Sequence, residues 1–130
     1  MGNQVSPMPE PGEQTLCVLV VDDAVGARLS LSSLLRVAGF TAYEASDAAQ
    51  ALVLMESSLP VDVLVTDVDM PGAMDGLALA EHVRRHWPAV AVVVASAGDH
   101  TAAVRDPEVL LLRKPYKPER LLGYLEEKRR

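Results

Sequence analysis

Two apolar runs of the sequence each end in aspartate, and this pattern predicts a metal site. The run Leu16–Val21 is followed directly by Asp22 and Asp23, and the mostly apolar run Val61–Thr66 is followed by Asp67. Carboxylates that crowd together repel one another unless a positive charge is held between them. Mg²⁺ prefers oxygen ligands and keeps several of its waters, so two or three carboxylates suit it. We therefore expect these acids to bind Mg²⁺.

Two further polar residues follow later apolar runs, and their chemistry predicts a phosphoryl-transfer site. Ser96 offers a hydroxyl donor, and Lys114 offers a compact positive charge. Catalysis of phosphoryl transfer consists mainly of positioning and charge neutralisation, which these groups provide. A carboxylate can itself be the nucleophile and form an aspartyl phosphate. Asp67 is the candidate, because the loop Met70–Gly72 after it allows a close approach.

Apolar runs alternate with helical patterns along the chain, which predicts an α/β fold with a parallel sheet. The expected strands are Leu16–Val21, Thr41–Ala45, Asp62–Thr66, Val90–Ala95 and Val109–Leu112. The expected helices are Ala24–Ala38, Asp47–Ser57, Gly76–Trp87 and a last helix from Pro118. Right-handed crossovers place the carboxyl ends of all strands at one edge, where ligands bind in such sheets. The acids, the serine and the lysine should therefore meet there.

The composition fits one domain and excludes several classes of protein. The chain has 130 residues, of which 49% are hydrophobic, and its formal net charge is −6. This charge argues against nucleic-acid binding, and no apolar run approaches the ~20 residues needed to span a bilayer. The single cysteine, Cys17, lies in an apolar run and is expected to be buried, which fits a cytoplasmic protein. Residues 1–14 are expected to form a disordered tail before a domain over residues 15–130.

The sequence resembles the receiver domains of two-component response regulators. The resemblance covers about Leu16–Lys128, and it rests on five motifs in matching order. They are Val20-Val21-Asp22-Asp23, Asp67-Val68-Asp69-Met70-Pro71-Gly72, Asp75-Gly76-Leu77, Ala95-Ser96-Ala97-Gly98 and Lys114-Pro115-Tyr116. The family implies a flavodoxin-like, doubly wound sheet of five parallel strands in the order 2-1-3-4-5, with helices on both faces. The segment between Ser96 and Lys114 is short for the family, so we expect a shortened fourth helix of one or two turns.

The resemblance implies that Asp67 accepts a phosphoryl group from a phosphohistidine. The donor would be a sensor histidine kinase or a histidine phosphotransfer protein. Ser96 would bond a phosphoryl oxygen, Lys114 would pair with the phosphoryl charge, and the Lys114–Pro115 bond is often cis in the family. Such a protein is not an enzyme acting on a separate substrate, but it catalyses its own Mg²⁺-dependent phosphorylation and dephosphorylation.

By the same resemblance, Asp22, Asp23 and Asp67 would hold Mg²⁺, with the backbone carbonyl of Asp69 as a further ligand. The chain resembles a stand-alone receiver, which would signal by binding an unidentified output protein or by passing the phosphoryl group on. We expect neither a nucleic-acid nor a membrane partner.

Leu111 departs from the family, and the positions of Asp69 and Gly98 tune the lifetime of the phosphoryl group in the family. The family couples the hydroxyl after the fourth strand to an aromatic residue three positions before the lysine, and here that position is Leu111. An aromatic-coupled switch is therefore in doubt. Gly98 lies two residues after Ser96 and should leave an attacking water unobstructed, which predicts a short-lived aspartyl phosphate.

Other interpretations remain open at this point. A pseudo-receiver would keep the fold and bind partners without phosphorylation. A haloacid-dehalogenase-like phosphatase would use the pair Asp67 and Asp69, but its motif normally follows the first strand. His82 and His86 lie one helical turn apart and could ligate a metal, although no third ligand is evident and a solvated helix face explains them better.

Overall fold

The computed structural model describes residues 15–100 and 103–129. The predicted disordered tail, residues 1–14, lies outside the described residues. The described chain contains five strands and four helices, which alternate except between the last two strands. They are β1 (Cys17–Val21), α1 (Val25–Val37), β2 (Thr41–Ala45), α2 (Ala48–Met55), β3 (Val63–Asp67), α3 (Gly76–His86), β4 (Ala91–Ser96), β5 (Leu110–Arg113) and α4 (Pro118–Arg129).

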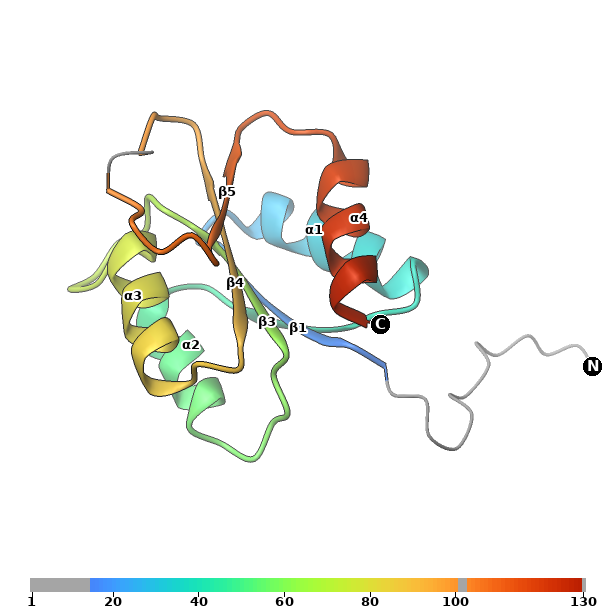
Figure 1. Cartoon of the computed structure of the whole chain (residues 1–130), viewed down its shortest axis with the longest axis horizontal. Helices are drawn as coiled ribbons and strands as arrows, with labels where there is room; N and C mark the ends of the chain where they lie inside the picture. Colours follow the sequence, from blue (N-terminus) through green and yellow to red (C-terminus); the bar gives the residue numbers. More distant parts are fainter. Residues whose placement is uncertain (1–14, 101–102, 130) are drawn as a thin grey trace, which may run out of the picture.

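The strands form one parallel sheet in the order β2-β1-β3-β4-β5, which confirms the predicted flavodoxin-like topology. Helices α2 and α3 cover one face of the sheet, and α1 and α4 cover the other (Figure 1). The register pairs Val21 with both Ala45 and Thr66, and it pairs Asp67 with Ala95. The carboxyl ends of neighbouring strands are therefore level with one another.

Aliphatic residues fill both faces of the central strands, as a sheet covered on both sides requires. On β1, Val18 and Val20 pack into the cluster beneath α1 and α4, whereas Leu19 and Val21 pack into the cluster beneath α2 and α3. All five β1 residues are buried. Such a strand is held rigidly, so the residues that follow it start from a fixed position.

Local signals in the sequence place the helix ends close to where they were expected. The Asp47 side chain accepts a hydrogen bond from the Gln50 amide at the start of α2. Asp75 likewise accepts one from the Ala78 amide at the start of α3. Gly39, with a φ of 96°, follows α1 in the left-handed conformation that terminates many helices.

The shortened fourth helix is absent from the described residues between β4 and β5. In the described part of this segment, the amides of Ala103 and Val104 donate to the His100 carbonyl, and the Val109 amide donates to the Asp106 carbonyl. Asp106 ties this segment to α3, because its carboxylate accepts the Glu108 amide (2.9 Å) and also pairs with Arg84 of α3 (2.8 Å). The resulting surface between α3 and this segment holds a hollow of about 530 Å³.

Cys17 begins β1 and is 3% exposed. Burial, and then the charge of Asp62, raise the pKa of its thiol to about 11. The Asp62 carboxylate also accepts the Cys17 amide at 2.8 Å. The cysteine is thus a buried apolar residue, as the sequence predicted. Among the helices of the described residues, none has the length and apolar character needed to cross a membrane.

Candidate functional site

The residues predicted to carry chemistry meet at the carboxyl edge of the sheet. Asp22 and Asp23 follow β1, and Lys114 follows β5. Asp67 and Ser96 are the last residues of β3 and β4, rather than the first residues after them as predicted. This shift of one position changes nothing in the site, because parallel pairing still brings all four strand ends to the same edge.

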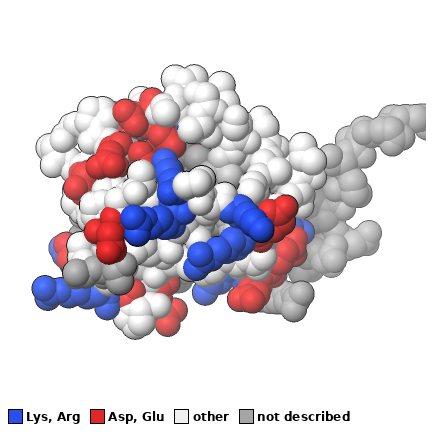
Figure 2. Space-filling model, turned by 90° about the horizontal axis from the view of Figure 1, so that it is seen from above, with Lys and Arg blue, Asp and Glu red and all other residues white. Residues whose placement is uncertain are grey.

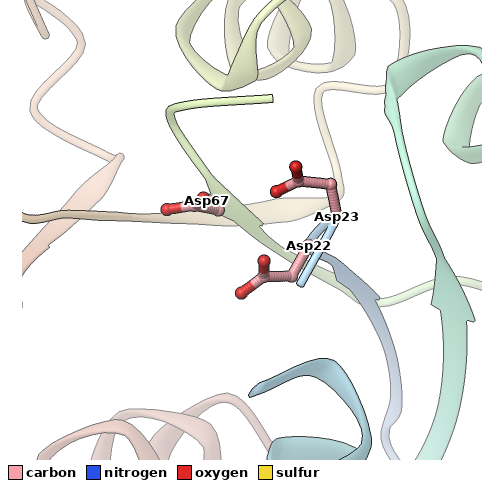
Figure 3. Close-up of side chains that lie close together, drawn as sticks. All are labelled: Asp22, Asp23 and Asp67. Atoms are coloured by element: carbon pink, nitrogen blue, oxygen red, sulfur yellow. The ribbon is translucent and has the colours of Figure 1, made fainter. Parts of the chain in front are cut away.

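The three acids form a compact cluster at this edge. One carboxylate oxygen of each of Asp22, Asp23 and Asp67 lies within 4.8 Å of the other two. Figure 3 shows their carboxylates projecting to the same side from the ends of β1 and β3. The side chains of Asp22 and Asp67 are each 13% exposed, whereas Asp23 is exposed. An all-oxygen set that is open on one side suits Mg²⁺, which keeps part of its water shell.

Lys114 supplies the positive charge of the site. Its ammonium donates to Asp67 Oδ1 at 2.9 Å, and it lies 3.9 Å from Asp22 Oδ2. Partial burial acts to lower the pKa of Lys114, but the hydrogen bond and charge of Asp67, with the charge of Asp22, outweigh burial and raise it. The amide of Lys114 donates to the Ser96 carbonyl at 2.7 Å, and the Lys114–Pro115 bond is cis. The lysine is therefore charged and aimed at Asp67.

Ser96 is fully buried, and its hydroxyl oxygen accepts the Gly98 amide at 3.0 Å. Gly98 itself lacks a side chain, but its surroundings are not empty. An added Cβ would lie 3.3 Å from His100 Nε2 and 3.8 Å from Ser96 Oγ. The imidazole of His100 therefore fills part of the space that the sequence suggested was open.

The β3–α3 loop is fixed by a glycine at the start of α3. The Gly76 amide donates to the Val68 carbonyl at 2.8 Å, and a Cβ on Gly76 would overlap the Asp67 carbonyl. Only glycine allows this approach of α3 to the end of β3. Asp69 is exposed in the same loop, and its side chain does not belong to the acidic cluster. The role predicted for its backbone carbonyl stays a prediction.

A polar network between α1 and β2 was missed by the sequence analysis. The Glu44 carboxylate of β2 accepts hydrogen bonds from Arg28 Nε (3.1 Å), the Ser32 hydroxyl (2.9 Å) and Arg36 Nη2 (3.4 Å). Arg28 Nη1 also donates to the backbone carbonyl of Asp22 at 2.9 Å. The spacing of the three α1 residues, four apart, was a signal for a shared helix face, because residues four apart are neighbours on a helix.

These contacts determine the charge of Glu44. Partial burial acts to raise the pKa of Glu44, but hydrogen bonds from Ser32 and Arg28 and the charges of Arg36 and Arg28 outweigh burial and lower it. The network is therefore an ionised carboxylate held between two guanidinium groups.

The remaining sequence candidates do not join the acidic cluster. Leu111 lies on β5, is half-buried, and packs against the apolar cluster beneath α2 and α3. The rings of His82 and His86 stack at 4.1 Å on α3, and His86 Nδ1 lies 2.9 Å from the His82 carbonyl. Neither histidine belongs to a group of three metal-ligating residues in the described chain.

The surface of the molecule carries mixed charge (Figure 2) and a hollow beside α3. Figure 2, a view from above, shows acidic and basic side chains side by side on one face. The hollow of about 530 Å³ lies beside α3 and is lined by residues such as Leu77, Arg84 and Val109, not by the three acids. A hydrated cation and a phosphoryl group need no such cavity, so the acidic edge remains the site that the chemistry indicates.

Comparisons with known proteins agree with this geometry. The family model of the response regulator receiver domain matches residues 18–126. The DNA-binding transcriptional regulator NtrC of Escherichia coli (strain K12) is 40% identical over 88 residues, which are 67% of this chain and 18% of NtrC. The chain thus spans less than a fifth of that relative's length.

Solved structures show the same fold. A response regulator receiver protein from Sinorhizobium medicae WSM419 matches with a TM-score of 0.81 and 25% identity, covering 89% of this chain and 95% of that one. The response regulator protein TrrA of Thermotoga maritima, in complex with Mg²⁺ and BeF, matches with a TM-score of 0.75 and 23% identity, covering 88% of this chain and 99% of TrrA. The chain therefore belongs to the response regulator receiver domain family of two-component signalling systems.

Proposed function

We propose that this receiver accepts a phosphoryl group on Asp67 from a phosphohistidine, with Mg²⁺ bound by the acidic cluster. The phosphorylated form then signals by changed protein binding or by passing the phosphoryl group on. The observation that carries the proposal is the contact of Lys114 Nζ with Asp67 Oδ1 at 2.9 Å inside the cluster of three acids.

The geometry suits attack by Asp67 on phosphorus. A carboxylate oxygen of Asp67 forms the new O–P bond, while the N–P bond of the phosphohistidine breaks and its electron pair returns to the imidazole. The transferred group carries negative charge on its oxygens, and Lys114 stands where it can pair with that charge. The bound cation would neutralise the remaining charge.

The oxygen atoms at this edge of the sheet suit Mg²⁺ as ligands. The three carboxylates offer only oxygen ligands, and the exposed side of Asp23 leaves room for water and for phosphoryl oxygens. The Asp69 carbonyl is proposed as a further ligand. The complex of TrrA with Mg²⁺ and BeF supports a magnesium site in this fold.

The proposed donor is a sensor histidine kinase or a histidine phosphotransfer protein, since receiver domains interact with both classes. A segment that makes up 12% of the sensor kinase CckA of Brucella abortus is 31% identical to this chain over 115 residues, so a domain of this kind also occurs within a sensor kinase. We propose that the chain catalyses only its own phosphorylation and dephosphorylation, not turnover of a separate substrate.

One observation favours a second candidate, a pseudo-receiver that binds partners without phosphorylation. Leu111 packs against the apolar cluster beneath α2 and α3, where the family places an aromatic residue that responds to the hydroxyl. The retained contact between Lys114 and Asp67 argues against this candidate, because a site without chemistry has no need of it.

The two candidates are separated by incubating the full chain with acetyl phosphate and Mg²⁺ and following its intact mass. We expect one phosphoryl group on the wild type, none on Asp67→Asn, and one on the matched variant Asp69→Asn. Asp69 is exposed and only two residues away, so this variant controls for the loss of one negative charge. A wild type as unreactive as Asp67→Asn would overturn the proposal, and turnover of a phosphate monoester abolished by Asp69→Asn would favour the phosphatase.

A further inference from the structure

Arg28 is the one α1 side chain in the described residues that reaches both the polar network and the acidic edge. Its Nη1 donates to the Asp22 carbonyl at 2.9 Å, while its Nε donates to Glu44 Oε1 at 3.1 Å. The Arg28 side chain is 16% exposed, so it is held within the protein and not spread over the surface. The two bonds fix the guanidinium plane, because its donors form a rigid fork.

The bonded carbonyl occupies a special place in the site. It belongs to the peptide unit that joins Asp22 to Asp23, and a peptide unit is planar. Holding this carbonyl therefore restrains the ψ angle of Asp22 and the φ angle of Asp23. Those two angles determine how the two carboxylates are directed relative to each other.

Other contacts hold the rest of this short loop. The Asp22 amide donates to the Ala45 carbonyl (3.1 Å), and Asp22 Oδ1 accepts the Ala24 amide (2.9 Å). These bonds fix the end of β1 and one side of the Asp22 carboxylate. Within the part of the chain that the structure describes, Arg28 is the residue that donates a hydrogen bond to the carbonyl of Asp22.

We infer that Arg28 is a positioning residue for the proposed magnesium site, in which it orients the Asp22–Asp23 peptide unit from α1. The inference rests on the proposed function only for the presence of Mg²⁺. It adds a second layer to the site, in which Glu44 orients Arg28 and Arg28 orients the two acids. The Ser32 hydroxyl also donates to Glu44, whereas Arg36 contacts Glu44 only at 3.4 Å from a side chain that is half exposed, so Arg36 lies outside this layer.

The charge of Arg28 and its hydrogen bond to the Asp22 carbonyl predict opposite changes in Mg²⁺ affinity when Arg28 is replaced, which allows a clear test. The positive charge of Arg28 repels a cation, so its removal should strengthen Mg²⁺ binding if charge alone mattered. Removal of its hydrogen bond to the carbonyl should weaken binding, because the two carboxylates lose their fixed alignment. Loss of groups that orient metal ligands commonly weakens metal affinity about tenfold or more.

The test measures the Mg²⁺ dissociation constant of the full chain by isothermal titration calorimetry, without a phosphoryl donor. We expect Arg28→Met to bind Mg²⁺ about tenfold more weakly than the wild type. Arg28→Lys keeps the charge but lacks the fork, and we expect a similar loss. The matched control is Arg36→Met, which removes the same charge from the same helix but has no contact with Asp22.

Arg36→Met should bind Mg²⁺ as well as the wild type does. Equal losses in Arg28→Met and Arg36→Met, or unchanged or tighter binding in Arg28→Met, would overturn the inference. Melting in EDTA shows which variants are folded, and Arg28→Lys provides the answer if Arg28→Met does not fold.

A second readout separates positioning from loss of the whole site. Phosphorylation of Arg28→Lys by acetyl phosphate should recover toward the wild-type rate as Mg²⁺ is raised to saturation. A deficit that persists at saturation would contradict a role through metal alignment. An unreactive wild type that still binds Mg²⁺ would overturn the proposed phosphotransfer and leave the role of Arg28 standing.

Discussion

Replacing Asp23 by asparagine should stabilise the metal-free protein and remove most of its response to Mg²⁺. Asp23 is exposed and forms no ion pair within residues 15–100 and 103–129, whereas Asp22 and Asp67 both lie near the ammonium of Lys114. It therefore contributes repulsion without a compensating pair. It is the cleanest position at which to test the electrostatics of the cluster.

The expected magnitude follows from the spacing of the carboxylates. The Asp23 oxygen lies within 4.8 Å of an oxygen of each of the other two acids. Two unit charges at such a distance interact by about 1 kcal/mol in water-like surroundings. Solvent screening and the nearby ammonium reduce the sum of two repulsions, so we expect a net gain of about 1 kcal/mol. For a domain of this size, that gain raises the melting temperature by about 4 °C.

Magnesium should reverse the order of the two proteins. A ligand that binds only the folded state, at a hundred times its dissociation constant, stabilises that state by about 2.7 kcal/mol. The wild type should gain this stabilisation. Asp23→Asn should gain much less of it, because the variant lacks one of the three carboxylates proposed to bind the ion. The variant is thus the more stable protein in EDTA and the less stable one in Mg²⁺.

The assay is thermal unfolding followed by circular dichroism, in EDTA and in MgCl₂ at matched ionic strength. Asp69→Asn is the control, because it removes one charge from the same edge, its side chain lies outside the cluster, and the substitution keeps the backbone carbonyl that is proposed as a ligand. It should respond to Mg²⁺ as the wild type does. A variant Asp23→Asn that melts at the wild-type temperature in EDTA, or that keeps the full response to Mg²⁺, would refute the reasoning.

Two further substitutions test features around the site. Gly76→Ala should lower the free energy of unfolding by roughly 2 kcal/mol, because its Cβ would overlap the Asp67 carbonyl. The control is Gly123→Ala on α4, where an added Cβ would meet no atom within 4 Å outside its own helix backbone and chain neighbours. This substitution should raise the free energy of unfolding by about 0.8 kcal/mol, and urea titrations with equal effects for both variants would contradict this account. Glu44→Gln tests the network: the folded-state pKa of Glu44 is lowered, so its stabilisation is present above its ordinary value of 4.5 and is lost as the pH falls through the folded pKa. The wild type should therefore exceed Glu44→Gln in stability above pH 4.5 and lose that advantage in acid, and a constant difference across this range would count against the network.

Sequence patterns were sufficient for the sheet and for the residues at its edge. Short aliphatic runs such as Cys17–Val21, alternating with helical patterns, are typical of strands buried on both faces. Once the strands are parallel, their carboxyl ends coincide, so Asp22 and Asp67 had to meet. Caps such as Asp75 act locally and can be recognised from a few residues.

Contacts between distant side chains could not be predicted in the same way. Ser32 lies inside a helix and would be expected to face solvent, yet it is fully buried because Glu44 of β2 accepts its hydroxyl. The imidazole of His100 beside Gly98 depends on the course of the chain after β4. Asp106, later in the same segment, has partners on α3 and in its own loop. Contacts of this kind depend on tertiary packing and not on the local sequence pattern.

The chemical inertness of Cys17 gives the protein a practical property. A thiol that is 3% exposed and has a pKa of about 11 is almost entirely protonated at neutral pH, so it reacts slowly with maleimides and oxidants. Val37 is 87% exposed, so a cysteine introduced at this position would be the preferred point of attachment for a dye. The native sulfur need not be removed first, so fluorescence can report on α1 in an otherwise unaltered chain.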